Sequence, residues 1–102
     1  MAATPEKKVK DKVTKTLREE GVYYFLPATH GFGRSGVPDI VCCVNGMFLG
    51  IECKAGKGKP TLLQLRELEA IRTAGGESVV IYEENIDMVR PLLRQLSSKR
   101  GA

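Results

Sequence analysis

The chain has 102 residues, a length that suits one domain with one hydrophobic core. Its formal net charge of +4 is compatible with a polyanionic partner but does not establish one. The three cysteines include no CxxC pair, which argues against a zinc site and against the disulfide framework of a small secreted protein. A polar N-terminus and the lack of a long apolar run predict a cytoplasmic protein without a signal peptide or a membrane span.

The first predicted element is a helix over residues 5–20. Thr4 can cap its start, and Gly21 can end it. A narrow apolar stripe is predicted to face the core, formed by Val9, Val13 and Leu17. Glu6 and Glu20 border this stripe, and each could be an ordinary surface glutamate or part of a site.

A β-branched and aromatic run over Val22–Leu26 predicts a strand, which Pro27 ends. A loop over residues 28–37 follows, and its glycines permit a close approach of the backbone to a ligand. His30 and Arg34 in this loop could contact phosphates, or the loop could be a simple connector.

A β-hairpin is the strongest signal in the sequence. Asn45-Gly46 lies between two apolar runs and predicts a two-residue type I′ turn, so that Val44 pairs with Met47. One side of this hairpin is apolar throughout and is predicted to be core, with Ile40, Cys42, Val44, Met47, Leu49, Ile51 and Cys53.

The same register places Asp39 opposite Glu52, with Lys54 two residues further along the same side. Like charges that face each other across a strand pair destabilise a sheet. The pair could be two surface carboxylates that Lys54 partly neutralises, or a β-bulge could separate them. Alternatively, the carboxylates could hold a divalent cation such as Mg²⁺, with Lys54 orienting or deprotonating a water or holding a phosphate oxygen. An ionic group at the edge of an apolar surface favours this last interpretation.

The basic loop after the hairpin carries Lys57 and Lys59, which suit phosphate contacts as well as they suit a solvated loop. Thr61 can cap a second helix over residues 62–74. Gln64 stands three residues after Thr61, so it could complete a capping box or take part in the site.

A last strand is predicted over Ser78–Tyr82, and Asn85 is predicted to cap a third helix. Pro91 predicts a kink in that helix or its division into two short pieces. Residues 97–102 are predicted to form a polar, basic tail. The order helix, three strands, helix, strand, helix predicts an α/β protein with one mixed sheet flanked by helices, whose second helix forms a parallel crossover.

Two motifs in this chain resemble those of a known family. Gly36-Val37-Pro38-Asp39 followed by Glu52-Cys53-Lys54 is similar to the signature of the PD-(D/E)XK nuclease superfamily, with a hairpin between its halves. With Gln64 at the start of the next helix, the chain resembles the VRR-NUC family over about residues 5–85. The resemblance implies a restriction-endonuclease-like αβββαβα core and one nuclease domain over residues 1–102, with flexible ends at 1–4 and 97–102.

The resemblance also implies roles for individual residues. The catalytic residues would be Glu6, Asp39, Glu52, Lys54 and Gln64. The metal would be held by Asp39, Glu52 and the backbone carbonyl of Cys53, and Lys54 would position or activate the attacking water. Glu20 is the alternative to Glu6 as the glutamate that a first helix usually contributes.

The activity that the resemblance implies is metal-dependent cleavage of DNA with Mg²⁺ or Mn²⁺, in a bacterium or a virus-infected host cell. Stand-alone members of this length resemble virus-type Holliday-junction resolvases, so a four-way junction or a flap is the expected substrate. A junction needs two cuts, and a homodimer supplies the second site by symmetry. Its interface could involve Phe48, Tyr23, Tyr24 or the C-terminal helix.

Three other interpretations remain open. The chain could be a DNA-binding module on an inactive nuclease fold, or a repair- or restriction-type nuclease that acts on other DNA. It could also be a small basic α/β protein whose acidic pair is incidental, which predicts no stabilisation by a metal.

Overall fold

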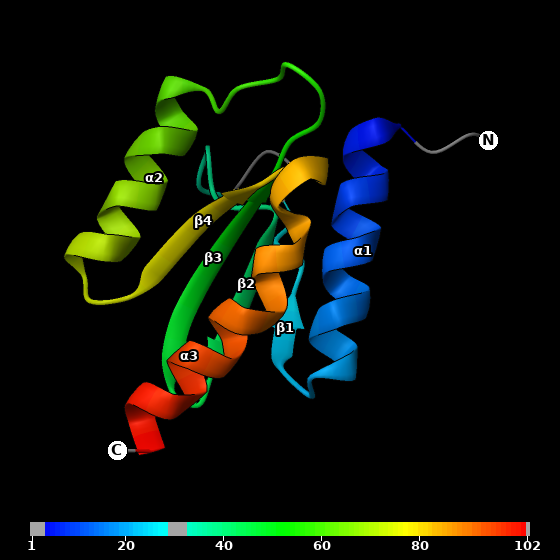
Figure 1. The fold of residues 1–102 in the computed structure, drawn as a ribbon. Helices are drawn as coiled ribbons and strands as arrows, with labels where there is room; N and C mark the ends of the chain where they lie inside the picture. Colours follow the sequence, from blue (N-terminus) through cyan, green and yellow to red (C-terminus); the bar gives the residue numbers. More distant parts are fainter. Residues whose placement is uncertain (1–3, 29–32, 102) are drawn as a thin grey trace.

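The computed structural model describes residues 4–28 and 33–101 of the chain. Helices and strands follow one another over these ranges in the expected order (Figure 1). Their bounds are α1 Pro5–Glu19, β1 Tyr23–Phe25, β2 Ile40–Val44, β3 Met47–Cys53, α2 Leu62–Thr73, β4 Glu77–Ile81, the 3₁₀-helix η1 Glu83–Met88 and α3 Val89–Gly101.

The strands form one mixed sheet in the order β1-β2-β3-β4. β1 and β3 run antiparallel to β2, and β4 runs parallel to β3 after the crossover through α2. α1 and α3 lie side by side on one face of this sheet, and α2 lies against the other (Figure 1). The predicted α/β class and the αβββαβα order are confirmed.

The hairpin of β2 and β3 has the predicted register, with Val44 opposite Met47 and Ile40 opposite Ile51. Asn45 and Gly46 both have positive φ, of 52° and 88°, as a type I′ turn requires. The apolar side of the hairpin is buried against α1 and α3 as expected. It joins one core of buried residues, which includes Val9, Val13, Leu17, Ile40, Cys42, Val44, Leu49, Ile51, Cys53, Ile81, Val89, Leu93 and Leu96.

The first and second helices begin where their caps predict. The Thr4 hydroxyl accepts a hydrogen bond from the Lys7 backbone N–H at the start of α1. α1 ends at Glu19, so Glu20 is its C-cap rather than its last helical residue. At the start of α2, Thr61 and Gln64 bond each other reciprocally in a capping box.

The third helix differs from the prediction. Asn85 does not cap α3 but lies within η1, where its side chain accepts from the Tyr82 N–H and donates to the Val80 carbonyl. Asn85 therefore closes the turn that follows β4. The predicted division into two pieces is confirmed as η1 and α3, and Pro91 lies in the first turn of α3, where a missing N–H does no harm. Residues 97–101, which were predicted to form a polar tail after the third helix, belong to α3.

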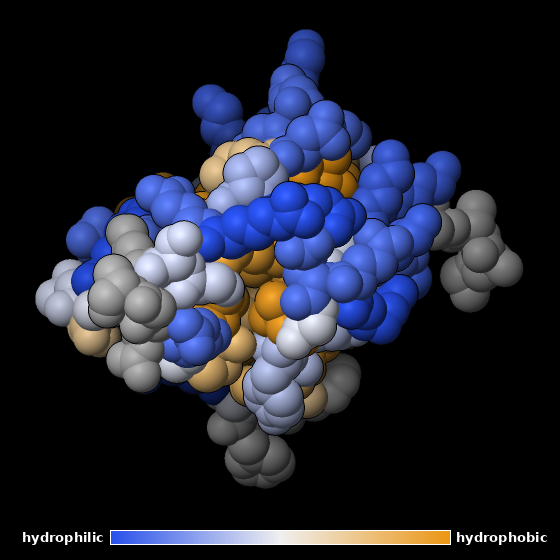
Figure 2. Space-filling view, turned by 60° about the horizontal axis from the view of Figure 1, so that its bottom comes forward, coloured by the Kyte–Doolittle hydropathy of each residue, from blue (hydrophilic) through white to orange (hydrophobic). Residues whose placement is uncertain are grey.

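The surface mixes apolar and charged areas. Seen from the lower end of Figure 1, a central apolar patch is bordered by hydrophilic residues (Figure 2). No helix within the described ranges is both long enough and apolar enough to cross a membrane.

Candidate active site

The start of β2 and the end of β3 bring the predicted acidic pair together. Asp39 directly precedes β2, and its Oδ2 accepts a hydrogen bond of 2.8 Å from the backbone N–H of Cys53. The register of the hairpin, continued by one step, places Asp39 opposite Glu52. The Asp39 carboxylate is thus fixed to the end of β3, and no bulge interrupts the ladder from residue 40 to residue 51.

Glu52 is the most unusual side chain of the molecule, because it is 1% exposed and carries an acidic group. Neither of its carboxylate oxygens accepts a hydrogen bond from any residue that the structure describes. Lys54 Nζ lies 3.4 Å from Oε2, an ion-pair distance. Burial above all, and then the charge of Asp39, raise the pKa of Glu52 to about 7, although Lys54 acts in the opposite direction.

Lys54 reaches the acidic pair from a well-fixed backbone. Its N–H donates a hydrogen bond of 2.9 Å to the carbonyl of Ile81, at the end of the neighbouring strand β4. Its side chain is 13% exposed, so the ammonium is held near Glu52 and away from bulk water. A cation in this position can bind an anionic oxygen or orient a water beside the carboxylates.

Lys10 of α1 belongs to the same group, and the sequence analysis missed it. Its Nζ lies 3.9 Å from Asp39 Oδ1, the oxygen that does not accept from Cys53. Lys10 stands four residues after Glu6, so the two share one face of α1. This four-residue spacing from Glu6 is the feature of the sequence that could have pointed to Lys10. We call Lys10, Asp39, Glu52 and Lys54 the site cluster.

The two candidates for the helix glutamate lie at opposite ends of α1. Glu20 is bonded to Arg90 and Arg94 of α3, and Glu19 is also paired with Arg90. We call these four residues the α1–α3 cluster. Glu6 is half-buried in the first turn, one turn before Lys10. The structure thus leaves Glu6 as the candidate nearer to the site cluster and engages Glu20 elsewhere.

The donor atoms at the site suit a hard divalent cation. Two carboxylates of opposing strands lie together, and the buried Glu52 oxygens have no hydrogen-bond donor among the described residues. Mg²⁺ takes oxygen ligands and often binds through one or two carboxylates plus water and substrate phosphate. The described ranges contain no group of three or more His, Cys, Asp or Glu side chains that is suited to a metal. Glu6 therefore does not join Asp39 and Glu52 as a third carboxylate of one metal-binding group in this structure.

Comparison with known proteins identifies the family. The sequence model of the family described as "Archaeal holliday junction resolvase (hjc)" matches residues 6–90. The chain belongs to this family. Among solved structures, one described as "VRR_NUC domain" superposes with a TM-score of 0.71 at 26% identity, over 90% of this chain and 97% of that one. The resemblance to VRR-NUC nucleases is therefore confirmed.

A viral relative agrees with this family. "Putative nuclease p44" of Acyrthosiphon pisum secondary endosymbiont phage 1 is 38% identical over 60 residues, which are 58% of this chain. The match spans 64% of that relative's own length.

Gln64, which the resemblance to VRR-NUC nucleases assigns to the site, has a structural task in this chain. Its Oε1 accepts a hydrogen bond of 2.8 Å from the Thr61 N–H, while its own N–H donates to the Thr61 hydroxyl. The capping box alone accounts for a glutamine at this position. Any contribution of Gln64 to the site would come from its remaining amide N–H groups.

The predicted phosphate-binding residues lie in different settings. The Arg34 Nε–H donates a bifurcated hydrogen bond to the two carboxylate oxygens of Glu67 of α2, at 2.9 Å from each, although 71% of the Arg34 side chain is exposed. Lys57 and Lys59 are exposed in the loop after β3. That loop is anchored, because the Gly58 carbonyl accepts from the Tyr82 hydroxyl and the Gly56 N–H donates to Glu83. His30 lies outside the described residues.

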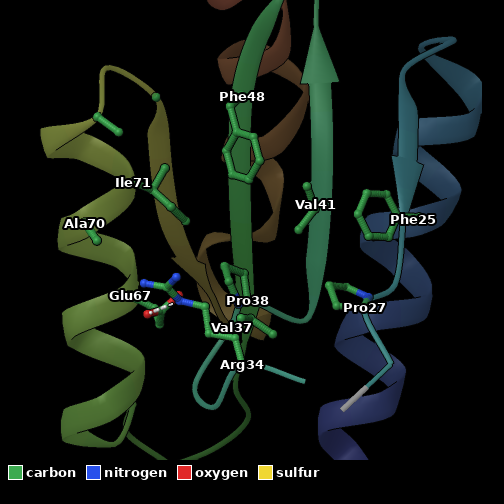
Figure 3. Close-up of a pocket in the computed structure, with 12 residues that line it drawn as sticks. Phe25, Pro27, Arg34, Val37, Pro38, Val41, Phe48, Glu67, Ala70 and Ile71 are labelled. Atoms are coloured by element: carbon green, nitrogen blue, oxygen red, sulfur yellow. Dashed lines mark hydrogen bonds and ion pairs between the residues drawn. The ribbon is translucent and has the colours of Figure 1, made fainter. Parts of the chain in front are cut away.

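An open apolar groove adjoins the site on the α2 face of the sheet (Figure 3). Its volume is about 550 Å³, and it lies between α2 and β1 with Val41, Phe48 and Pro38 along its floor. The Arg34–Glu67 ion pair borders one end, and Phe25 borders the β1 side (Figure 3). α2 covers only part of this face, so the groove leaves large apolar side chains in contact with solvent.

Proposed function

We propose that this protein is a metal-dependent endonuclease that cleaves branched DNA, with the four-way junction as its main substrate. One observation carries the proposal: the buried Glu52 carboxylate faces Asp39 beside a fixed lysine. Burying an ionisable group without hydrogen bonds is costly, and a ligand that neutralises it offsets that cost. Family membership supplies the substrate class, because the matching family is named for resolving Holliday junctions.

Three residues of the site cluster, Asp39, Glu52 and Lys54, have distinct tasks in this function. Asp39, Glu52 and the backbone carbonyl of Cys53 would hold Mg²⁺ or Mn²⁺, which supplies charge neutralisation at the phosphate and lowers the pKa of a bound water. Asp39 is kept in a binding orientation by the Cys53 N–H. Lys54 offers a cation where negative charge accumulates during attack on phosphorus. Glu6 would extend the site through a water from the start of α1.

DNA would approach along the basic loop between β3 and α2. Lys57 and Lys59 are exposed close to the site in sequence, and the anchored loop presents them on a defined backbone. Contacts of this kind neutralise phosphates without reading sequence, which suits recognition of a DNA shape. Arg34 could join them by releasing Glu67.

A second copy of the chain would provide the second cut. The interface of this proposed homodimer is the apolar groove and its rim, where Phe25 is 49% and Phe48 46% exposed. Exposed aromatic side chains of this kind are enriched at protein–protein interfaces, which supports the groove as the contact surface. We expect light scattering to give the mass of a dimer, and Phe48→Glu to give a monomer. Met88→Glu, an exposed residue of η1, is the matched control and should remain dimeric.

The function is tested by cleavage of a labelled four-way junction, a flap and a linear duplex in Mg²⁺, Mn²⁺ or EDTA. Asp39→Asn should abolish cutting, whereas Asp11→Asn, which removes an exposed carboxylate paired with Lys7, should not. Equal cutting of all three DNAs would remove the junction preference and favour a repair- or restriction-type nuclease. Tight DNA binding without cutting by the wild type would contradict the nuclease and favour a binding module.

A further inference from the structure

Lys10 is a cation that the chemistry above does not use. It comes from α1, across the sheet edge from the hairpin that carries the other members of the site cluster. Its Nζ approaches Asp39 Oδ1 at 3.9 Å, and 31% of its side chain is exposed. The contact is an ion pair at the longer end of the range, and Asp39 Oδ2 is already bonded to Cys53. Lys10 therefore occupies the free side of the Asp39 carboxylate.

The charges of the site cluster balance in the absence of a metal. Asp39 and the ionised form of Glu52 supply two negative charges, and Lys10 and Lys54 supply two positive ones. A divalent cation that binds between the carboxylates would therefore add two unbalanced positive charges beside Lys10. Lys54 is fixed by burial near Glu52, whereas Lys10 is the more exposed lysine and pairs at the longer distance. Lys10 is thus the cation that can move.

We propose that Lys10 is a movable counter-ion, which neutralises Asp39 in the metal-free protein and transfers to a DNA phosphate when the metal binds. The proposal rests on the metal-dependent function above and adds a coupling between metal and DNA. Metal binding must separate Lys10 from Asp39, and the released ammonium then favours a phosphate. A bound phosphate likewise draws Lys10 away and leaves Asp39 free for the metal. Such coupling is reciprocal, because each ligand raises the affinity of the other by the same factor.

A structural ion pair makes the opposite prediction for a variant without the lysine charge. If Lys10 only supported the fold around Asp39, removing it would disturb the ligand and weaken metal binding. If Lys10 competes with the metal, removing it strengthens metal binding. Two charges 4 Å apart in a largely aqueous setting interact by enough to change an affinity about fivefold.

The experiment is calorimetric titration of Ca²⁺, which takes the same oxygen ligands as Mg²⁺, with and without a four-way junction. We expect Lys10→Met to bind Ca²⁺ about fivefold more tightly than the wild type without DNA. We also expect the junction to tighten Ca²⁺ binding in the wild type and to do so less in Lys10→Met. Lys15→Met, at an exposed position of α1, is the matched control and should behave as the wild type, as should Lys10→Arg.

Each failure has a distinct signature. If the wild type binds Ca²⁺ and Lys10→Met binds it equally or more weakly, the counter-ion role is overturned while the proposed function stands. Equal effects of the junction on the wild type and Lys10→Met overturn the coupling. A wild type that binds none of Ca²⁺, Mg²⁺ or Mn²⁺ overturns this inference together with the proposed function. Circular dichroism melting of each variant confirms that the titrated protein is folded.

Discussion

The site cluster and the α1–α3 cluster each contain two carboxylates and two basic side chains. Glu20 of the α1–α3 cluster is hydrogen-bonded, whereas Glu52 of the site cluster is buried without a hydrogen bond from a described residue. In the α1–α3 cluster, Glu20 accepts hydrogen bonds from Arg90 and Arg94 at the surface. In the site cluster, Glu52 is buried with only Lys54 at ion-pair distance among the described residues. The hydrogen bonds from Arg94, ahead of those from Arg90, lower the pKa of Glu20, whereas burial raises that of Glu52.

This difference distinguishes the structural ion pairs of the α1–α3 cluster from the proposed metal site. Guanidinium groups satisfy the oxygens of Glu20, and the result holds α1 against α3 without capacity for a further ligand. Glu52 is buried and its oxygens accept no hydrogen bond from a described residue, so its negative charge is costly until a proton or a cation neutralises it. The number and sign of the charged groups are the same in both clusters, so hydrogen-bond satisfaction and burial are the informative quantities.

The largest expected effect is on cleavage. We expect Glu52→Gln to lower the rate of junction cutting on the order of a thousandfold, because the proposed metal site would lose a charged ligand. Glu20→Gln makes the same chemical change in the α1–α3 cluster and should cut at close to the wild-type rate. Single-turnover assays with saturating DNA compare the two variants. Similar losses in both would show that the contrast between the clusters has no functional meaning.

The same two variants should change stability in opposite directions. Because the pKa of Glu52 is raised, its contribution to the folding stability is fully present below about pH 4.5 and is lost as the pH rises through about 7. Glutamine resembles the protonated acid, so in EDTA at pH 8 Glu52→Gln should be more stable than the wild type by about 3 kcal/mol. The difference should vanish near pH 4.5.

Because the pKa of Glu20 is lowered, its contribution to the folding stability is present above pH 4.5 and is lost as the pH falls. Glu20→Gln should therefore be less stable than the wild type at pH 8. Urea unfolding at several pH values measures both variants. Mg²⁺ should stabilise the wild type at pH 8 and not Glu52→Gln. A wild type that is the more stable protein in EDTA at pH 8 would contradict the assigned state of Glu52.

Two glycines that flank the clusters offer a smaller contrast. Gly36, three residues before Asp39, has a φ of +77°, and an added Cβ would lie 2.9 Å from the Leu63 backbone. Gly21, directly after Glu20, has a φ of +69° and an open surrounding. We expect Gly36→Ala to cost about 3 kcal/mol through backbone strain and the clash, and Gly21→Ala to cost about 1 kcal/mol through strain alone. Thermal unfolding compares them, and equal costs would exclude close packing at Gly36.

The smallest effect concerns the thiols of the hairpin. Cys43 is exposed, whereas Cys42 and Cys53 are buried, and burial raises the pKa of both to about 12. A thiol reagent at pH 8 should therefore modify Cys43 quickly and the other two only after denaturation. Rapid modification of Cys53 in the native protein would mean that the strand between Glu52 and Lys54 opens to solvent. The readout is the number of thiols that react before and after guanidinium is added.

Local rules predicted the hairpin and much of the site. Asn45-Gly46 and the alternating side chains fix the register without any distant contact, and that register alone brings Asp39 opposite Glu52. The caps at Thr4 and Thr61 are also local, because each bonds a backbone N–H three residues away. The family resemblance then supplied a chemistry for the pair, while the role of each residue remains a prediction.

Long-range pairings account for what the sequence did not predict. Lys10 meets Asp39, and Arg34 meets Glu67, through packing between elements far apart in the chain. The choice between Glu6 and Glu20 depended in the same way on where α3 places its arginines. Asn85 was misassigned because a capping residue and a turn-closing residue have the same local signature, and only β4 decides between them.

The register of the hairpin also bears on how the chain folds. Asp39 and Cys53 are bonded across fourteen residues within one hairpin, a unit that forms in about 1–10 μs, whereas β4 must await the long crossover through α2. We therefore expect the two carboxylates to come together before the sheet is complete. We expect their repulsion to act on the rate of folding more than on the rate of unfolding. We thus expect the acidic pair of the proposed metal site also to slow the folding of the chain to its native state.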